Sequence, residues 1–228
     1  MHASSECEVV IIIRATMVDR IVNNPPRPED EIREAIVTGR LQPNERLIES
    51  SLSQTLGVGR SAVRTALARL EHEGLVEHER NRGARVRLVD EHEAVEILET
   101  RAVLEGLAAR YAATRATAAD VEDLRRILMG MRRLLDAGDL LGASDANAVL
   151  HRRLIEIAGH ATALRLIATL KSQLVRFQYR TILLPGRSER SFAEHHAIVE
   201  AVASGDPVAA EVAMRTHLSH VAAALHNG

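Results

Sequence analysis

Cysteine, aromatic residues and long apolar runs are scarce in this chain of 228 residues. The single cysteine, Cys7, argues against a disulfide framework and against a cysteine-rich zinc site. Aromatic residues make up 2% of the sequence and tryptophan is absent, which argues against a recognition surface built on stacked rings. No apolar run approaches the roughly 20 residues that a transmembrane helix needs, so we expect no membrane partner.

Lysine is almost absent as well, and the net charge is small. Lys171 is the only lysine beside 28 arginines, and the formal net charge is −2, so any surface for nucleic acid has to be local. Hydrophobic residues make up 46% of the chain and charged residues 26%, which is typical of a globular protein with a buried core. The apolar stretch Val9–Ile13 is short, follows no basic residue and precedes no cleavage motif, unlike a signal peptide. We therefore expect a cytoplasmic protein with an N-terminal tail over residues 1–28.

Residues 29–89 contain short elements separated by turn residues. Apolar spacing predicts helices over 29–38, 49–56 and 61–72, followed by short strands at 75–76 and 84–88 around a polar hairpin tip. Helix, turn, helix and then a two-stranded wing is the winged helix-turn-helix arrangement, whose last helix lies in the major groove of DNA. We therefore predict a DNA-binding domain over residues 29–89.

Arginine residues on the third helix support that prediction. Arg60 and Arg64 are one helical turn apart and can point the same way, and Arg69 falls near the same outward face. Between residues 60 and 87, seven arginines stand against four glutamates, a local charge of about +3. Arginine binds phosphates and can also bond guanine with two hydrogen bonds. The alternative is an ordinary solvated face.

Residues 90–228 have helical spacing almost throughout, which predicts a separate domain built as a helical bundle. The segment Thr117–Asp120 resembles a capping box and opens a helix that runs to about Ala137. Gly and Pro residues separate further helices at about 91–114, 140–157, 161–183, 189–203 and 207–225. The predicted fold class is mainly α, with an N-terminal winged helix-turn-helix and a C-terminal all-α helical bundle, whose interior can host a ligand or metal.

The positions of the histidines in the bundle indicate a candidate metal site. Asn147 and His151 are four residues apart and face one direction, while His195 and His217 lie on two later helices. Three imidazoles and one oxygen donor suit a divalent transition metal. With 11 histidines in the chain, an ordinary polar core is the alternative.

Several motifs occur in the order found in a known family. They are Ile32–Pro43, Leu56–Leu70 and Glu73–Val76. These segments resemble the GntR family of bacterial transcription regulators. In that family, the arginines that contact DNA correspond to Arg60 and Arg64, and the contact at the wing tip to Arg82 and Gly83. With their neighbours, the predicted DNA-contacting residues are Arg60, Ser61, Arg64, Arg69, Arg82 and Gly83.

The sequence departs from the usual pattern of that family at a few positions. Asn44 replaces a usual glycine, and Gly59 replaces the usual serine or threonine before the recognition helix. Thr65 stands where glutamate is usual, and Ser50 where some relatives carry an arginine that contacts DNA. These differences bear on the operator sequence that the protein reads.

The second half resembles the FadR C-terminal (FCD) ligand-binding domain. The resemblance rests on Glu99–Glu105, Asn147–His151, Ile157–Gly159, Glu194–Ile198 and Met214–Leu218. It implies a divalent metal, zinc or nickel, on Asn147, His151, His195 and His217. Asn147 stands where the family has an aspartate. Asp145 cannot replace it, because it lies about 120° away from His151 around the helix.

The resemblance also makes Arg101 the candidate clamp for an effector carboxylate. A buried salt bridge between Arg101 and a glutamate of the bundle is the alternative. We predict a homodimeric regulator, acting as a repressor, that binds an inverted-repeat operator and responds to a small organic acid. Two rivals remain, a regulator that senses the metal itself and a metal-dependent hydrolase. Against the hydrolase, the sequence has no His-Glu-x-x-His motif.

Overall fold

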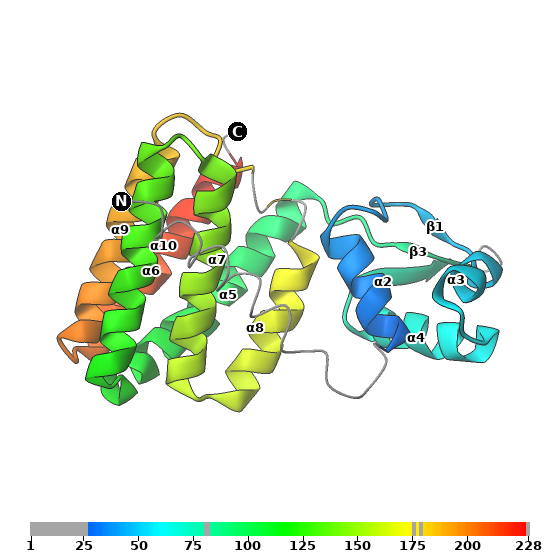
Figure 1. The fold of residues 1–228 in the computed structure, drawn as a ribbon, viewed down its shortest axis with the longest axis horizontal. Helices are drawn as coiled ribbons and strands as arrows, with labels where there is room; N and C mark the ends of the chain where they lie inside the picture. Colours follow the sequence, from blue (N-terminus) through cyan, green and yellow to red (C-terminus); the bar gives the residue numbers. More distant parts are fainter. Residues whose placement is uncertain (1–26, 80–82, 175–176, 178–179, 227–228) are drawn as a thin grey trace, which may run out of the picture.

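The computed structural model describes residues 27–79, 83–174, 177 and 180–226. Figure 1 shows the two parts of the chain side by side, with the small N-terminal part at one end and the helical bundle at the other. In Figure 1 the parts meet at the start of the first bundle helix, α5 (Glu91–Arg115), and beside the helix α8 (Ala161–Gln173), where Gln173 bonds Glu73. No helix within the described ranges is long and apolar enough to cross a membrane.

Within residues 27–79 and 83–89, the N-terminal part has three helices and a small antiparallel sheet. Its strands lie in the order β1-β3-β2, with Arg46 opposite Arg85 and Val76 opposite Val86. The two-residue strand β1 was not expected, because it is too short to show an alternating pattern. In chain order the elements are α2 Pro28–Val37, β1 Arg46–Leu47, α3 Glu49–Leu56, α4 Arg60–His72, β2 Val76–Glu79 and β3 Gly83–Val86.

The core of this part is built on one face of α4. Val63, Ala66, Leu67 and Leu70 are almost fully buried, at the spacing of a helix face that packs against α2 and the sheet. The opposite face, which begins with Arg60, stays exposed to solvent. The outward face predicted for Arg60 and Arg64 is therefore confirmed, whereas Arg69 lies about 180° around the helix from Arg60 and not near the same face.

Two turns of the N-terminal part use left-handed backbone. Asn44 has φ 68°, and asparagine tolerates this conformation better than other residues with a side chain. This explains why asparagine can stand where the resembled family has glycine. Gly83 has φ 81° at the end of the hairpin, where a side chain would strain the turn.

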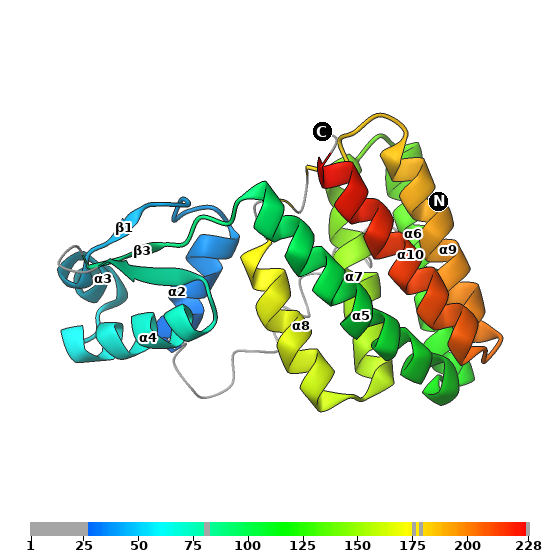
Figure 2. The ribbon, with the colours of Figure 1, turned by 180° about the vertical axis from the view of Figure 1, so that it is seen from behind.

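The helical bundle contains the six predicted helices. α10 packs along α5 and α9, and α6 packs against α7 and α9, as Figure 2 shows from behind. The contact between α5 and α10 is close at Gly106, where a Cβ atom would lie 2.6 Å from Cγ of Arg215. The capping box at Thr117 is present. The helices are α5 Glu91–Arg115, α6 Ala118–Asp136, α7 Leu140–Ala158, α8 Ala161–Gln173, α9 Arg187–Ala203 and α10 Pro207–His226.

One predicted helix, over 161–183, was wrong in length. α8 ends at Gln173, and the described residues after it form turns that bury Phe177 in the core of the bundle. Pro185 disfavours helical backbone at the residue before it, and Thr181 and Ile182 are β-branched and poor helix formers. The turns let Phe177, Thr181 and Ile182 line a cavity inside the bundle.

Candidate functional site

The recognition helix α4 presents two of the predicted DNA-contacting arginines to solvent. Arg60 is its first residue, and Arg64 follows one turn later with 70% of its side chain exposed. Glu49 of α3 holds Arg64 by two hydrogen bonds, from Nε at 3.0 Å and from Nη2 at 2.8 Å. This pair lowers the pKa of Glu49, mainly through the hydrogen bond from Arg64. The carboxylate orients the arginine and leaves it accessible.

The other predicted DNA contacts are distributed less evenly. Ser61 is exposed beside Arg60, and Gly83 opens β3 at the hairpin. Arg69 is nine residues beyond Arg60, about 180° around the helix, and it forms an ion pair with the buried Glu29 of α2. Its position thus gives it a structural role in joining two helices. Arg82 lies outside the described residues.

Three histidines from three helices converge in the bundle. His151 of α7, His195 of α9 and His217 of α10 each offer a ring nitrogen, and these nitrogens lie within 4.8 Å of one another. The Nε2 atoms of His151 and His195 are 3.2 Å apart. All three side chains are buried. The structure therefore brings together the three histidines that the sequence singled out.

Two glutamates orient two of these rings from behind. Glu105 of α5 lies 2.6 Å from Nδ1 of His151, and Glu194 of α9 lies 2.7 Å from Nδ1 of His217. Since each carboxylate accepts a hydrogen bond from Nδ1–H, the Nε2 atom of each ring keeps its lone pair for another partner. A carboxylate behind a histidine is the usual arrangement around protein-bound metals.

Burial keeps the imidazoles neutral, which is the form that binds metals. It lowers the pKa of His151 to about 4, although Glu105 acts in the opposite direction. Burial also lowers the pKa values of His195 and His217. For Glu105, burial raises the pKa, but the positive charges of Arg101 and Lys171 outweigh it and hold the pKa well below its usual value.

Asn147 lies in the wall of the cavity that the three histidines also line. The cavity has a volume of about 170 Å³ and is lined by His151, His195 and His217 as well as by Asn147. The Oδ1 atom of Asn147 is buried and has no hydrogen-bond partner among the described residues. A buried acceptor without a partner costs roughly 1–3 kcal/mol, so this oxygen is suited to a ligand that the cavity would hold.

Arg101, the predicted carboxylate clamp, lines the same cavity but is already engaged. Its Nε and Nη2 atoms each lie 2.8 Å from Oε1 of Glu105, one turn further along α5. This is the buried salt bridge that the sequence left open as the alternative. By fixing Glu105, Arg101 also fixes the ring of His151, and its contact with an effector stays a prediction.

Sequence reasoning missed four residues of this site. Glu105 is one turn from Arg101 and could have been found by that spacing. Glu194 precedes His195 but acts on His217, and no local pattern predicts such a contact. Lys171 and Arg187 are long, charged side chains that line the cavity, whereas such residues usually lie at the surface.

A small winged helix-turn-helix with two exposed arginines, joined to a helical bundle whose cavity is lined by three buried histidines, defines a DNA-binding regulator. The family comparisons agree with this class. The model of the "Bacterial regulatory proteins, gntR family" matches residues 28–86, and that of the "FCD domain" matches residues 96–220. The chain belongs to the gntR family and carries an FCD domain, and it is a DNA-binding transcriptional regulator, not an enzyme.

Individual relatives extend over most of the chain. It is 32% identical to the "Probable D-xylose utilization operon transcriptional repressor" of Paenarthrobacter nicotinovorans, covering 81% of this chain and 80% of the relative. It is 29% identical to the transcriptional regulator LutR of Bacillus subtilis, covering 82% of this chain and 94% of LutR. The solved structure of E. coli McbR/YncC has the same fold, with a TM-score of 0.71 at 20% identity over 88% of this chain and 95% of that one.

Proposed function

We propose that a small organic acid binds in the cavity of the bundle and changes the affinity of the winged helix-turn-helix for its operator. The observation that carries this proposal is the cluster of His151, His195 and His217 in the wall of a buried cavity. The effector has to bind the DNA-competent and DNA-incompetent arrangements unequally, because only differential affinity shifts an equilibrium.

The residues present fit a divalent metal ion, zinc or nickel. His151, His195 and His217 would hold it through ring nitrogens, and the unpartnered Oδ1 of Asn147 would supply an oxygen. A bound ion would add positive charge and coordination positions for the oxygens of an acid. Because all four ligands are neutral, the ion would keep its full charge inside the protein, which is costly without an anion. Metal and acid should therefore promote each other's binding.

Calorimetric titration of nickel or zinc into metal-stripped protein tests this part of the proposal. The Asn147→Asp variant should bind the metal more tightly, because the carboxylate offsets part of its charge. Asp145→Asn is the matched control, since Asp145 is exposed on another side of the same helix. A dicarboxylate should strengthen metal binding to the wild type. Equal affinity of wild type and Asn147→Asp, with and without acid, would contradict the metal site.

The metal-sensing alternative is distinguished by measuring operator affinity with metal and acid added separately and together. If the ion itself were the effector, metal alone would change operator affinity and the acid would add nothing. We favour the acid, because the cavity extends beyond the histidines to Ser188 and Thr181, which suits a ligand larger than an ion.

We further propose that the protein acts as a homodimeric repressor on an inverted repeat. A single recognition helix buries a small interface, and pairing two half-sites supplies the specificity that one lacks. Repression is supported by the name of the relative from Paenarthrobacter nicotinovorans. Light scattering at micromolar concentration should give a dimer. A monomer that binds a single half-site tightly would refute this.

A further inference from the structure

Arg187 is a buried arginine with unused donors. It is the first residue of α9, lines the cavity and is 4% exposed. Its Nη2 atom lies 3.0 Å from Oε2 of Glu194, but Nε and Nη1 are buried without a hydrogen-bond partner among the described residues. Leaving donors of a charged group unpaired inside a protein is costly. A group with acceptor oxygens would remove that cost.

The guanidinium of Arg187 lies close to the histidine cluster. The oxygen of Glu194 that accepts from Arg187 also accepts from Nδ1 of His217, at 2.7 Å. Arg187, Ser191 and His195 are spaced four residues apart on α9 and share one face of it. All three residues line the cavity. A ligand bound at the histidines could therefore reach the free donors of Arg187 with its far end.

The charged side chains around the cavity also favour an anionic ligand. Arg101, Lys171 and Arg187 line it, and the glutamates that contact this set are Glu105 and Glu194. With neutral histidines, three positive and two negative charges leave an excess of one positive charge, before any metal ion is added. Burial lowers the pKa of Lys171, Glu105 acts against this shift, and Arg101 acts with it. An effector with a single carboxylate, bound at the histidines, would leave the free donors of Arg187 without an acceptor.

We propose that Arg187 binds the second carboxylate of a small dicarboxylate effector, whose first carboxylate lies at the histidine cluster. The inference rests on the proposed function and specifies the chemical class of its ligand. Arg101 is unsuited to this task, because Nε and Nη2 are both bonded to Glu105. Arg187 has free donors on two nitrogens, and arginine is well matched to carboxylate oxygens.

Paired acids of equal length test the proposal. Succinate carries a carboxylate at both ends, whereas butyrate carries a methyl group in place of the second carboxylate. Each acid is titrated calorimetrically into the nickel-loaded full-length protein. The wild type should bind succinate about 10- to 100-fold more tightly than butyrate. In Arg187→Gln this preference should largely disappear, while butyrate binding stays within about threefold. Arg190→Gln, an exposed arginine on the same helix, should keep the preference.

The nickel affinity of Arg187→Gln shows whether its histidine cluster is intact, and its melting temperature shows whether it folds. If this variant fails to fold, Arg187→Lys serves instead, because lysine retains the positive charge. The lysine variant should lose most of the preference, since one ammonium replaces the planar donors. Equal binding of the two acids by the wild type would overturn the role of Arg187 and leave the proposed effector site intact. Loss of both acids to the same extent in Arg187→Lys would also overturn it. Binding of neither acid by the wild type would overturn the proposed function together with this inference.

Discussion

Replacing Gln173 with alanine should weaken the communication between the two parts of the protein. Gln173 is the last residue of α8, and its Nε2 donates a hydrogen bond of 2.9 Å to the backbone oxygen of Glu73, just after the recognition helix. Gly74 leaves room for this contact, because a Cβ atom there would lie 2.5 Å from the same Nε2. Lys171, about 200° around α8 from Gln173, lines the cavity of the bundle. One short helix thus contacts both the cavity and the DNA-binding domain.

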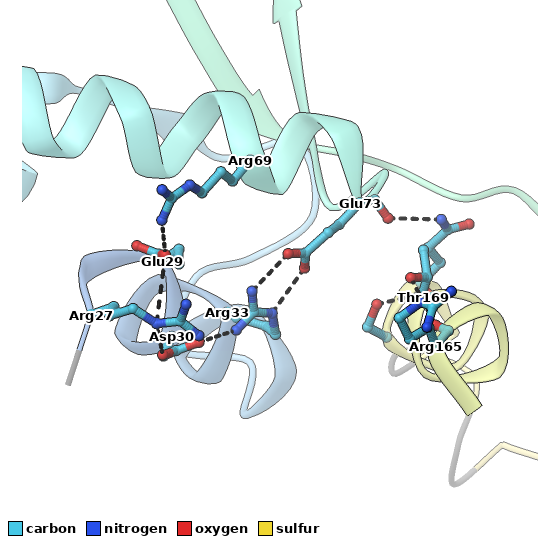
Figure 3. Close-up of polar contacts among 10 residues, drawn as sticks. Arg27, Glu29, Asp30, Arg33, Arg69, Glu73, Arg165 and Thr169 are labelled. Atoms are coloured by element: carbon cyan, nitrogen blue, oxygen red, sulfur yellow. Dashed lines mark hydrogen bonds and ion pairs between the residues drawn. The ribbon is translucent and has the colours of Figure 1, made fainter. Parts of the chain in front are cut away.

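From Glu73 the contacts continue into the DNA-binding domain. Its carboxylate accepts two hydrogen bonds from Arg33 of α2, at 2.9 and 2.8 Å. The same helix carries Glu29, which pairs with Arg69 of the recognition helix, as Figure 3 shows. A shift of α8 would therefore reach α4 through Glu73 directly and through α2.

The size of the effect follows from the bond that is lost. A neutral hydrogen bond contributes about 0.5–1.5 kcal/mol, which corresponds to roughly a 2- to 13-fold change in an equilibrium constant. If the bond forms in one arrangement only, Gln173→Ala should change the effect of the acid on operator affinity by this factor. Typical couplings between two sites are about 1–3 kcal/mol, so the change is a large share of the whole.

Fluorescence anisotropy can measure this on a labelled operator selected from random DNA by the wild-type protein. Affinities are compared at fixed salt with and without saturating acid, because phosphate contacts make them salt-dependent. Thr169→Ala is the matched control, since its hydroxyl bonds only Arg165 of the same helix in the described structure. If Gln173→Ala and the control respond to the acid as the wild type does, the contact does not couple the two parts.

Two further predictions concern DNA binding and stability. Arg60→Ala and Arg64→Ala should each weaken specific operator binding by about 1–3 kcal/mol, while thermal unfolding changes little because both side chains are exposed. Wild-type affinity in anisotropy measurements at matched salt would refute the docking of α4. Leu150→Ala should lower the free energy of unfolding by about 2–5 kcal/mol, because Leu150 is fully buried in the bundle core. Leu166→Ala should change the free energy of unfolding little, because Leu166 is 50% exposed. Similar urea midpoints for the two variants would contradict this prediction.

The sequence alone predicted most of the elements and the family, since these depend on local patterns. The face Val63–Leu70, the capping box at Thr117 and the glycines that end the helices act over a few residues, so they can be recognised without the fold. The length of α8 could not be predicted in this way. The segment after α8 buries Phe177 in a core built by distant helices, which no local pattern shows.

The residues of the candidate site were also predicted only in part from the sequence. Spacing and resemblance singled out His151, His195 and His217, but their approach to within 4.8 Å depends on how three helices pack. The partners of Arg64 and Arg69, Glu49 and Glu29, come from other helices as well. That Arg101 is engaged while Arg187 keeps free donors was decided by tertiary structure, because a buried charge pairs with whichever group the packing places beside it. Periodicity along the chain determines which face a helix buries, whereas the fold determines what that face meets.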